Sequence, residues 1–177
     1  MTILGAIPRD PAIYGSGLGS VKIERYVDRL ISHHKLFEST DAVDLKAFLA
    51  KIGGQLEFGE TVESLVVRDK NNFTIFLPNL TSWRRDRFTI AHELGHYFLH
   101  YRYFDLDERE IPEKRFKRYG RSGAETEANH FAGMFLMPRN RFVRRFGETD
   151  GNVADLANMF EVSTAAAQVR CQALRLE

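Results

Sequence analysis

Apolar positions along the chain follow two different periods, which predict helices toward both ends of the sequence and a short sheet between them. Residues 21–37 carry apolar side chains three and four positions apart, a spacing typical of an amphipathic helix. A second helix is expected to be capped by Thr40 or Asp41 and to end at the glycine pair that follows residue 52.

Three short runs of apolar and β-branched residues come next and predict strands at 55–58, 65–68 and 73–77. The polar segment 69–72 separates the second run from the third, which predicts an antiparallel hairpin. Pro78 is expected to end the last strand because it cannot donate a backbone hydrogen bond.

Beyond residue 82 the apolar spacing is helical again for most of the chain. The charged stretch 105–123 interrupts it, with acidic residues mostly before basic ones. We interpret this stretch as a solvated surface loop, with a substrate-facing loop as the alternative. The predicted helices on either side of it are 83–101, 122–137, 153–160 and 163–176.

Composition and charge narrow the class of protein. The 177 residues are 44% apolar and 28% charged, and 25 basic side chains against 24 acidic ones give a net charge of +1. This balance excludes a disordered or fibrous chain and provides no field typical of a nucleic-acid coat. Cys171 is the single cysteine, so metal ligands would have to be histidines and acids. We expect a cytoplasmic protein, because we find neither a membrane-spanning run nor a secretory signal.

The predicted helix 83–101 contains the most informative motif. His92 and His96 are four residues apart, so both imidazoles leave one face of the helix and can reach a single Zn²⁺. Glu93 lies beside them, within reach of a water at the metal. A pair of hydrogen-bonded core histidines is the alternative. Gly95, a poor helix former, favours the metal site because it indicates that another element approaches this face closely.

A catalytic zinc site needs a third protein ligand and an open position. His100 continues the four-residue spacing, but it lies about 12 Å along the helix axis from His92 and is better interpreted as support for the ligands. On the predicted helix 122–137, Glu125 shares a face with small and apolar residues. A buried carboxylate is costly unless it is paired or bound to metal, so Glu125 is the predicted third ligand.

Two neighbours of Glu125 complete the expected site. Glu127 is the alternative third ligand, and is otherwise interpreted as a solvated helix residue. Asn129, one turn after Glu125, is expected to accept a hydrogen bond from the non-ligating N–H of a zinc histidine, with a helix-packing hydrogen bond as the alternative.

Such a site predicts a hydrolytic mechanism. Two histidines and one carboxylate leave Zn²⁺ with residual positive charge, which activates water and polarises a carbonyl, while Glu93 serves as general base. Mn²⁺ or Fe²⁺ is compatible with the same ligands. The donor that stabilises the oxyanion stays open among five residues: Tyr97, His100, Tyr101, Tyr103 and His130.

The segments RFTIAHELGHYFLH and ETEANHFAGMFLMP together resemble the ImmA/IrrE family of zinc metallo-endopeptidases, and the likeness extends over about residues 20–177. The resemblance implies that His92, His96 and Glu125 bind zinc and that Glu93 is the catalytic base of a thermolysin-like site. It further implies that the substrate is a helix-turn-helix repressor, or an antitoxin, whose cleavage relieves repression.

The expected fold is α+β: a small antiparallel or mixed sheet packed against a zinc-binding helical bundle, with a C-terminal helix-turn-helix-like segment. We expect an irregular arm at 1–20, a metallopeptidase domain at 21–146 and an appendage at 147–177 that packs on it. The residues expected to form the appendage's small core are Ala157, Phe160, Val162, Ala166 and Val169. Its last helix offers few polar side chains for reading bases, so DNA binding is not expected.

Two other functions are compatible with the motifs. One is a non-catalytic zinc-containing regulator that binds protein or DNA through its C-terminal helices, and the other is a zinc hydrolase of a small substrate. A structural zinc site has no use for a base beside its ligands, so Glu93 favours an enzyme over the non-catalytic regulator.

Overall fold

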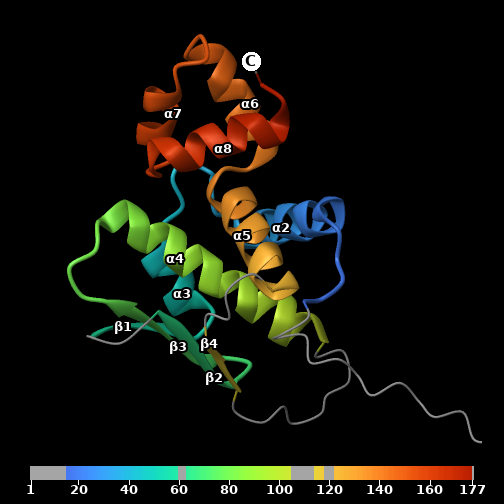
Figure 1. The fold of residues 1–177 in the computed structure, drawn as a ribbon, viewed down its shortest axis with the longest axis vertical. Coiled ribbons are helices and arrows are strands. Elements are labelled where there is room, and N and C mark those ends of the chain that lie inside the picture. Colours follow the sequence, from blue (N-terminus) through green and yellow to red (C-terminus); the bar gives the residue numbers. More distant parts are fainter. Residues whose placement is uncertain (1–14, 60–62, 105–113, 118–121, 177) are drawn as a thin grey trace, which may run out of the picture.

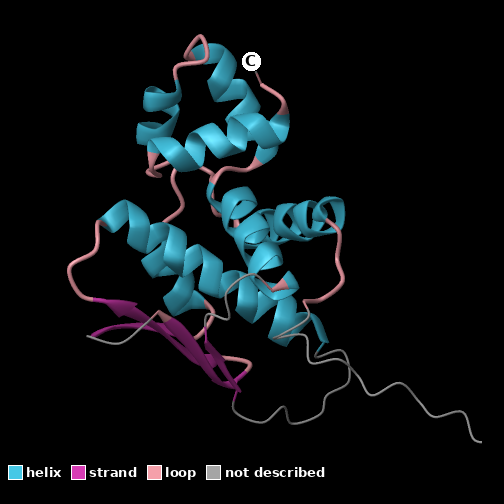
Figure 2. Ribbon diagram, in the orientation of Figure 1, coloured by secondary structure: helices cyan, strands magenta, loops and turns pink. Residues whose placement is uncertain are grey.

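The structure, a computed structural model, describes residues 15–59, 63–104, 114–117 and 122–176. The expected arm at 1–20 therefore lies mostly outside the described residues, as does most of the charged stretch 105–123. The predicted α+β class is confirmed, because one four-stranded mixed sheet lies against a set of helices (Figures 1 and 2).

Helices account for most of the described chain. Those of α type are α2 (Ser20–His34), α3 (Leu45–Lys51), α4 (Trp83–Gly95), α5 (Gly123–Leu136), α6 (Arg139–Glu148), α7 (Val153–Met159) and α8 (Thr164–Leu174). Two short turns continue α4: the π-helical η1 (His96–Tyr101) and the 3₁₀ turn η2 (Arg102–Phe104). None of the helices in the described segments has the length and apolar character required to cross a bilayer.

The sheet has the order β1-β3-β2-β4. Its strands are β1 (Gly54–Gly59), β2 (Ser64–Asp69), β3 (Asn72–Pro78) and β4 (Lys114–Lys117). β2 and β3 form the predicted antiparallel hairpin, β1 runs parallel to β3, and β4 runs antiparallel to β2. The interpretation of residues 114–117 as loop is wrong. A four-residue strand with Phe116 as its single buried apolar side chain leaves no alternation to detect.

The helix α3 begins later than predicted. Asp44 caps it by accepting a hydrogen bond from the backbone N–H of Ala47 at 2.9 Å, so the expected caps Thr40 and Asp41 are wrong. The carboxylate of Asp41 instead pairs with Arg141 and Arg145 of α6, at 3.0 and 2.7 Å. A long-range ion pair therefore removes the side chain that local sequence favoured as a cap.

One apolar core runs through the molecule in layers (Figure 1). α4 lies on the sheet, and α5 packs against both α4 and α2. The inward-facing sheet residues that form the base of this core are Leu65, Val67, Phe73, Ile75 and Leu77, all fully buried. This arrangement places the middle of α4 between the sheet and α5, away from bulk water.

The C-terminal helices α6 to α8 form the opposite end of the molecule from the sheet (Figure 1). Ala157, Phe160 and Val162 are buried there as predicted, and Ala166 is half-buried. Val169 is 63% exposed, so its assignment to the small core is wrong. The inward face of α8 is made of four other residues: Ala167, Arg170, Cys171 and Leu174.

Candidate metal centre

Two capped helices cross closely at the candidate site. Ser82 caps α4, and Ser122 caps α5 by accepting a hydrogen bond from the backbone N–H of Glu125 at 3.2 Å. At the crossing, a Cβ on Gly95 would lie 2.9 Å from the Cα of Ala128. The absence of a side chain at Gly95 therefore lets the backbones approach, as the sequence indicated, and sets Glu125 opposite the α4 histidines.

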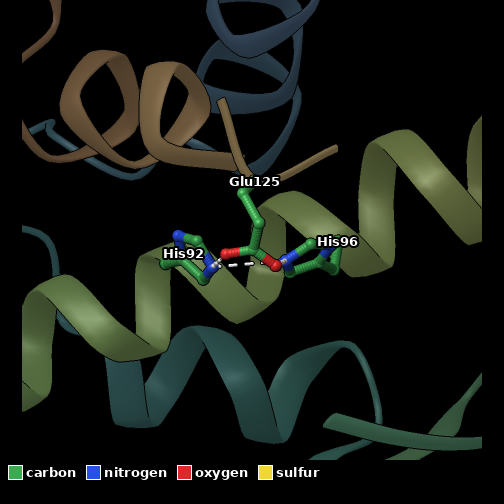
Figure 3. A group of neighbouring side chains, drawn as sticks. All are labelled: His92, His96 and Glu125. Atoms are coloured by element: carbon green, nitrogen blue, oxygen red, sulfur yellow. Dashed lines mark hydrogen bonds and ion pairs between the residues drawn. The ribbon is translucent and has the colours of Figure 1, made fainter. Parts of the chain in front are cut away.

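His92, His96 and Glu125 come together in the interior between these helices, as Figure 3 shows. The Nε2 atoms of the two histidines are 3.2 Å apart, and each lies 3.3 Å from one carboxylate oxygen of Glu125. Ligands of a tetrahedral Zn²⁺ bound at about 2.05 Å are spaced about 3.3 Å apart. The two Nε2 atoms thus have the spacing of two corners of a zinc coordination tetrahedron, and the carboxylate of Glu125, which faces each of them with a different oxygen, can supply the third ligand atom.

The chemistry of the donors also fits a cation. The Nδ1 atom of His92 faces the side-chain oxygen of Asn129 at 2.9 Å, so Nδ1 donates and Nε2 carries a lone pair toward Glu125. Lone pairs of His92 and His96 and a carboxylate then converge on one point. These electron-rich groups repel one another, and a metal ion bound at this point would be coordinated by all three. A proton bound there would relieve the repulsion less completely.

The charge of Glu125 follows from the same contacts. Burial by itself raises the pKa of this carboxyl, but hydrogen bonds from His92 and His96, which can carry a proton on Nε2 when no metal is bound, outweigh burial and hold the pKa well below its usual range. Glu125 is therefore ionised at neutral pH and can act as an anionic ligand. Its side chain is 8% exposed, so it is a charged group within the protein interior.

The turn of helix after His96 differs from the predicted regular helix. Residues His96–Tyr101 adopt the π form, in which backbone hydrogen bonds skip one more residue than in an α-helix. In this turn the Nδ1 atoms of His96 and His100 lie 2.9 Å apart. His100 is 1% exposed, and its Nε2 is 3.0 Å from a carboxylate oxygen of Glu127.

The hydrogen-bond directions at His100 follow from its charge. Burial, aided by the neighbouring His96, lowers the pKa of His100 to about 4, so its ring is neutral at pH 7. Because its Nε2 faces a carboxylate, Nε2 carries the proton and Nδ1 accepts from His96. His96 therefore presents the lone pair of its Nε2 to Glu125, as a metal ligand requires.

Glu127 is not part of the cluster of His92, His96 and Glu125, and it is not solvated as the alternative interpretation expected. Its oxygens accept hydrogen bonds from Ser16, Gly17 and His100, and its side chain is 12% exposed. Burial raises its pKa, but hydrogen bonds from Ser16 and His100 outweigh this effect and lower it. The helical-wheel argument missed this contact because the partners come from distant segments.

Glu93, the candidate base, and the candidate oxyanion donors lie in different environments. Glu93 is 3% exposed and directly follows His92 in α4. Two of the five suggested oxyanion donors are engaged elsewhere: the hydroxyl of Tyr97 donates to the backbone carbonyl of Lys70, and His100 uses both ring nitrogens. His130 is exposed on α5.

A groove of about 720 Å³ lies beside the candidate site, between α5, α8 and the start of α2. Phe88, one turn before His92, and Asn129, the partner of His92, both line it. Most of its other walls are apolar and include Met134, Val169 and Leu174.

Comparison with known proteins identifies the family. The profile of the IrrE N-terminal-like domain, peptidase family M78, matches residues 55–172. The chain belongs to this family. The predicted resemblance is thereby confirmed, and a metallopeptidase-type enzyme is supported in general terms. The matched region contains all three residues of the candidate metal site.

Other comparisons are more distant. A search of curated proteins found no match. Among solved structures, a Mycobacterium tuberculosis transcriptional regulator is similar, with a TM-score of 0.55 and 15% sequence identity over 83% of this chain. The match covers 45% of that protein, so this M78 chain spans less than half of its length. At this identity the likeness concerns the fold.

Proposed function

We propose that this protein is a zinc-dependent endopeptidase that cleaves a helix-turn-helix repressor, or an antitoxin, and so relieves repression. The observation that carries the proposal is the convergence of the Nε2 atoms of His92 and His96 and the carboxylate of Glu125, 3.2 and 3.3 Å apart, with Glu93 next to the first ligand. Membership in the M78 peptidases supports the reaction class. A repressor substrate would place the activity in the cytoplasm.

Each residue of the site has a separate role in the proposed reaction. His92, His96 and Glu125 would hold the ion, which supplies Lewis-acid activation of water and of the peptide carbonyl. Glu93 accepts a proton from the attacking water and delivers it to the leaving amine. Its location inside the protein strengthens its electrostatic interactions, because water screens them less there. Asn129 orients His92, so that its Nε2 remains directed at the ion.

The apolar groove supports a polypeptide substrate over a small polar one. It reaches His92 through Asn129 and has room for several apolar side chains. A repressor contains such side chains in its helices. The similar solved structure is named a transcriptional regulator, which agrees with a role in gene regulation but comes from a likeness of fold.

The test is cleavage of the repressor-like protein encoded beside this gene, by purified zinc-loaded enzyme. Wild-type protein is expected to cut it at a defined bond, and Glu93→Gln is expected to lose about 10²–10⁴-fold in rate while it keeps its metal. Glu57→Gln, on the exposed face of β1, is the matched control and should cut at the wild-type rate.

Two outcomes would contradict the proposal. An intact repressor after incubation with zinc-loaded wild-type enzyme would overturn the proposed substrate. Cleavage at an unchanged rate by Glu93→Gln would overturn the assigned base, since no other residue was given that role.

A further inference from the structure

We propose that residues 15–17, near the N-terminus, position the metal ligand His96 through Glu127 and His100. We call residues 15–17 the N-terminal loop, and His96, His100 and Glu127 the relay. The inference deepens the proposed function by adding positioning residues to its metal site. It rests on that proposal for the role of His96 as a ligand.

The relay is a directed chain of hydrogen bonds. His96 Nδ1 donates to His100 Nδ1 at 2.9 Å, and His100 Nε2 donates to Glu127 Oε2 at 3.0 Å. Both nitrogens of the buried His100 ring are used, so the ring cannot turn over without loss of both bonds. The orientation of Glu127 therefore fixes that of His100, which fixes the ring of His96.

The N-terminal loop fixes Glu127 in turn. The backbone N–H and the hydroxyl of Ser16 donate to Glu127 Oε2, both at 2.7 Å, and the backbone N–H of Gly17 donates to Oε1 at 3.0 Å. Ser16 and Glu127 are 111 residues apart in sequence. Two successive backbone N–H groups directed at one carboxylate form an anion-binding concavity.

Glycine is required for this contact at one position in particular. Gly15 and Gly17 have φ values of +85° and +72°, in the left-handed region that favours glycine. A Cβ on Gly15 would lie 3.0 Å from the carboxylate carbon of Glu127, whereas a Cβ on Gly17 would have no neighbour within 4 Å. The loop thus lies directly against Glu127 at Gly15.

The relay is not needed to hold α4 against α5. Their close crossing is made by Gly95 against Ala128, and apolar residues pack on either side of it. A buried chain of polar groups instead carries a desolvation cost that apolar residues would avoid. What it provides is a single tautomer and a single ring orientation at His96, and groups of this kind typically strengthen metal binding about 10–100-fold.

The experiment measures Zn²⁺ dissociation constants by chelator competition, together with the visible spectrum of the Co²⁺-loaded protein and the melting temperature without metal. Glu127→Ala is expected to weaken Zn²⁺ binding about 10–100-fold and to change the Co²⁺ spectrum. Glu127→Gln, which keeps an oxygen for His100, should restore part of the affinity.

Gly15→Ala and Gly17→Ala form the matched pair. Both place a methyl group on a left-handed residue, so both should lower the melting temperature by similar amounts. We expect Gly15→Ala to weaken Zn²⁺ binding several-fold, because its methyl displaces the Glu127 carboxylate. Gly17→Ala should bind Zn²⁺ within two-fold of wild type. Ser16→Ala, which removes one hydroxyl donor, is a milder variant should Glu127→Ala fail to fold.

The outcomes separate this inference from the proposed function. The positioning role alone would be overturned if the variants lowered the melting temperature but kept the wild-type Zn²⁺ affinity and Co²⁺ spectrum. This result would have to be found in Gly15→Ala and in either Glu127→Ala or Ser16→Ala. Relay-dependent metal binding without repressor cleavage would support the inference and overturn the peptidase proposal. A wild-type protein that binds no metal would overturn both.

Discussion

The interior between α4 and α5 and the interior of the C-terminal helices each contain a buried charge. The groups that surround the two charges differ in kind. Arg170 of α8 is 6% exposed, and its donors meet acceptors: the carbonyl of Met137 at 3.0 Å and Glu24 at 3.2 Å. Glu125 of α5 meets two imidazole nitrogens that can present lone pairs to a metal ion. The charge of Arg170 is paired with groups of the protein itself, whereas the surroundings of Glu125 suit a metal ion that the protein binds.

This difference separates a structural buried charge from a functional one. Arg170 is one of the few polar side chains of α8, and it ties α8 to Glu24 of α2 and to Met137 at the end of α5. Complementary partners within the chain give a buried ion a structural role. Convergent groups of like character indicate a ligand site.

The largest expected effect is at Glu125. Glu125→Gln should weaken Zn²⁺ binding by about 10³-fold, since one of three ligands contributes about a third of a typical site's binding free energy. The metal-free protein should keep its melting temperature, because the amide of glutamine can accept a hydrogen bond from one histidine nitrogen and donate to the other. Chelator competition and thermal unfolding in EDTA measure both. A wild-type Zn²⁺ affinity would remove Glu125 from the ligand set.

Arg170 should behave in the opposite way. Arg170→Met leaves Glu24 and the Met137 carbonyl without this donor and is expected to lower the free energy of unfolding by about 2 kcal/mol. Arg175→Met, at an exposed position of the same segment, should change it by less than about 0.5 kcal/mol. Urea unfolding checks both variants. Equal effects would mean that burial and pairing of Arg170 do not contribute to stability.

Alanine substitutions at two glycines compare a tightly packed helix face with an open one. Gly95→Ala places a methyl 2.9 Å from the Cα of Ala128 and should cost about 2 kcal/mol of stability, because backbone cannot easily move aside. Gly133→Ala in α5 meets no atom within 4 Å and should stabilise the protein by about 0.5–1 kcal/mol through helix propensity. Thermal unfolding of both variants at one pH is the measurement.

The smallest expected effect concerns Asp41, a charge at the edge of the C-terminal helices. Burial raises its pKa, but Arg145 and Arg141 outweigh burial and lower it. The folded pKa is thus below the unfolded one, so Asp41 stabilises the fold above about pH 4 and loses this contribution as the pH falls through its folded pKa. Asp41→Asn should cost about 1 kcal/mol at pH 7 and progressively less as the pH falls from about 4 through the folded pKa. A constant difference across this range in urea unfolding would contradict the assignment.

Local patterns were sufficient for most elements. The helix spacing and the hairpin turn predicted α2, α4, α5, α7, α8 and the β2–β3 pair. The sequence did not reveal β4, because its pairing with β2 is a contact between distant segments. It misplaced the cap of α3 for the same reason, since Asp41 is engaged by α6.

The features of the candidate site likewise separate into those that a local sequence pattern predicts and those that depend on packing between distant segments. The four-residue spacing of His92 and His96 and the position of Glu93 lie within one helix, so the sequence alone determined them. Glu125 could be anticipated because a carboxylate on a helix's buried face is costly, and Asn129 because it lies one turn after Glu125 on the same helix. The distances between His92, His96 and Glu125 depend on how closely α4 and α5 cross.

Tertiary structure alone decided the role of Glu127. From its position on α5 it is one of two acidic residues, and helical spacing places it away from the face that carries Glu125. Its partners are His100, brought near by the crossing of α5 over the end of α4, and Ser16, which lies 111 residues earlier in the chain. Hydrogen bonds between distant segments leave no periodic signal in a sequence, because their partners are chosen by the packing of helices and not by spacing along one of them.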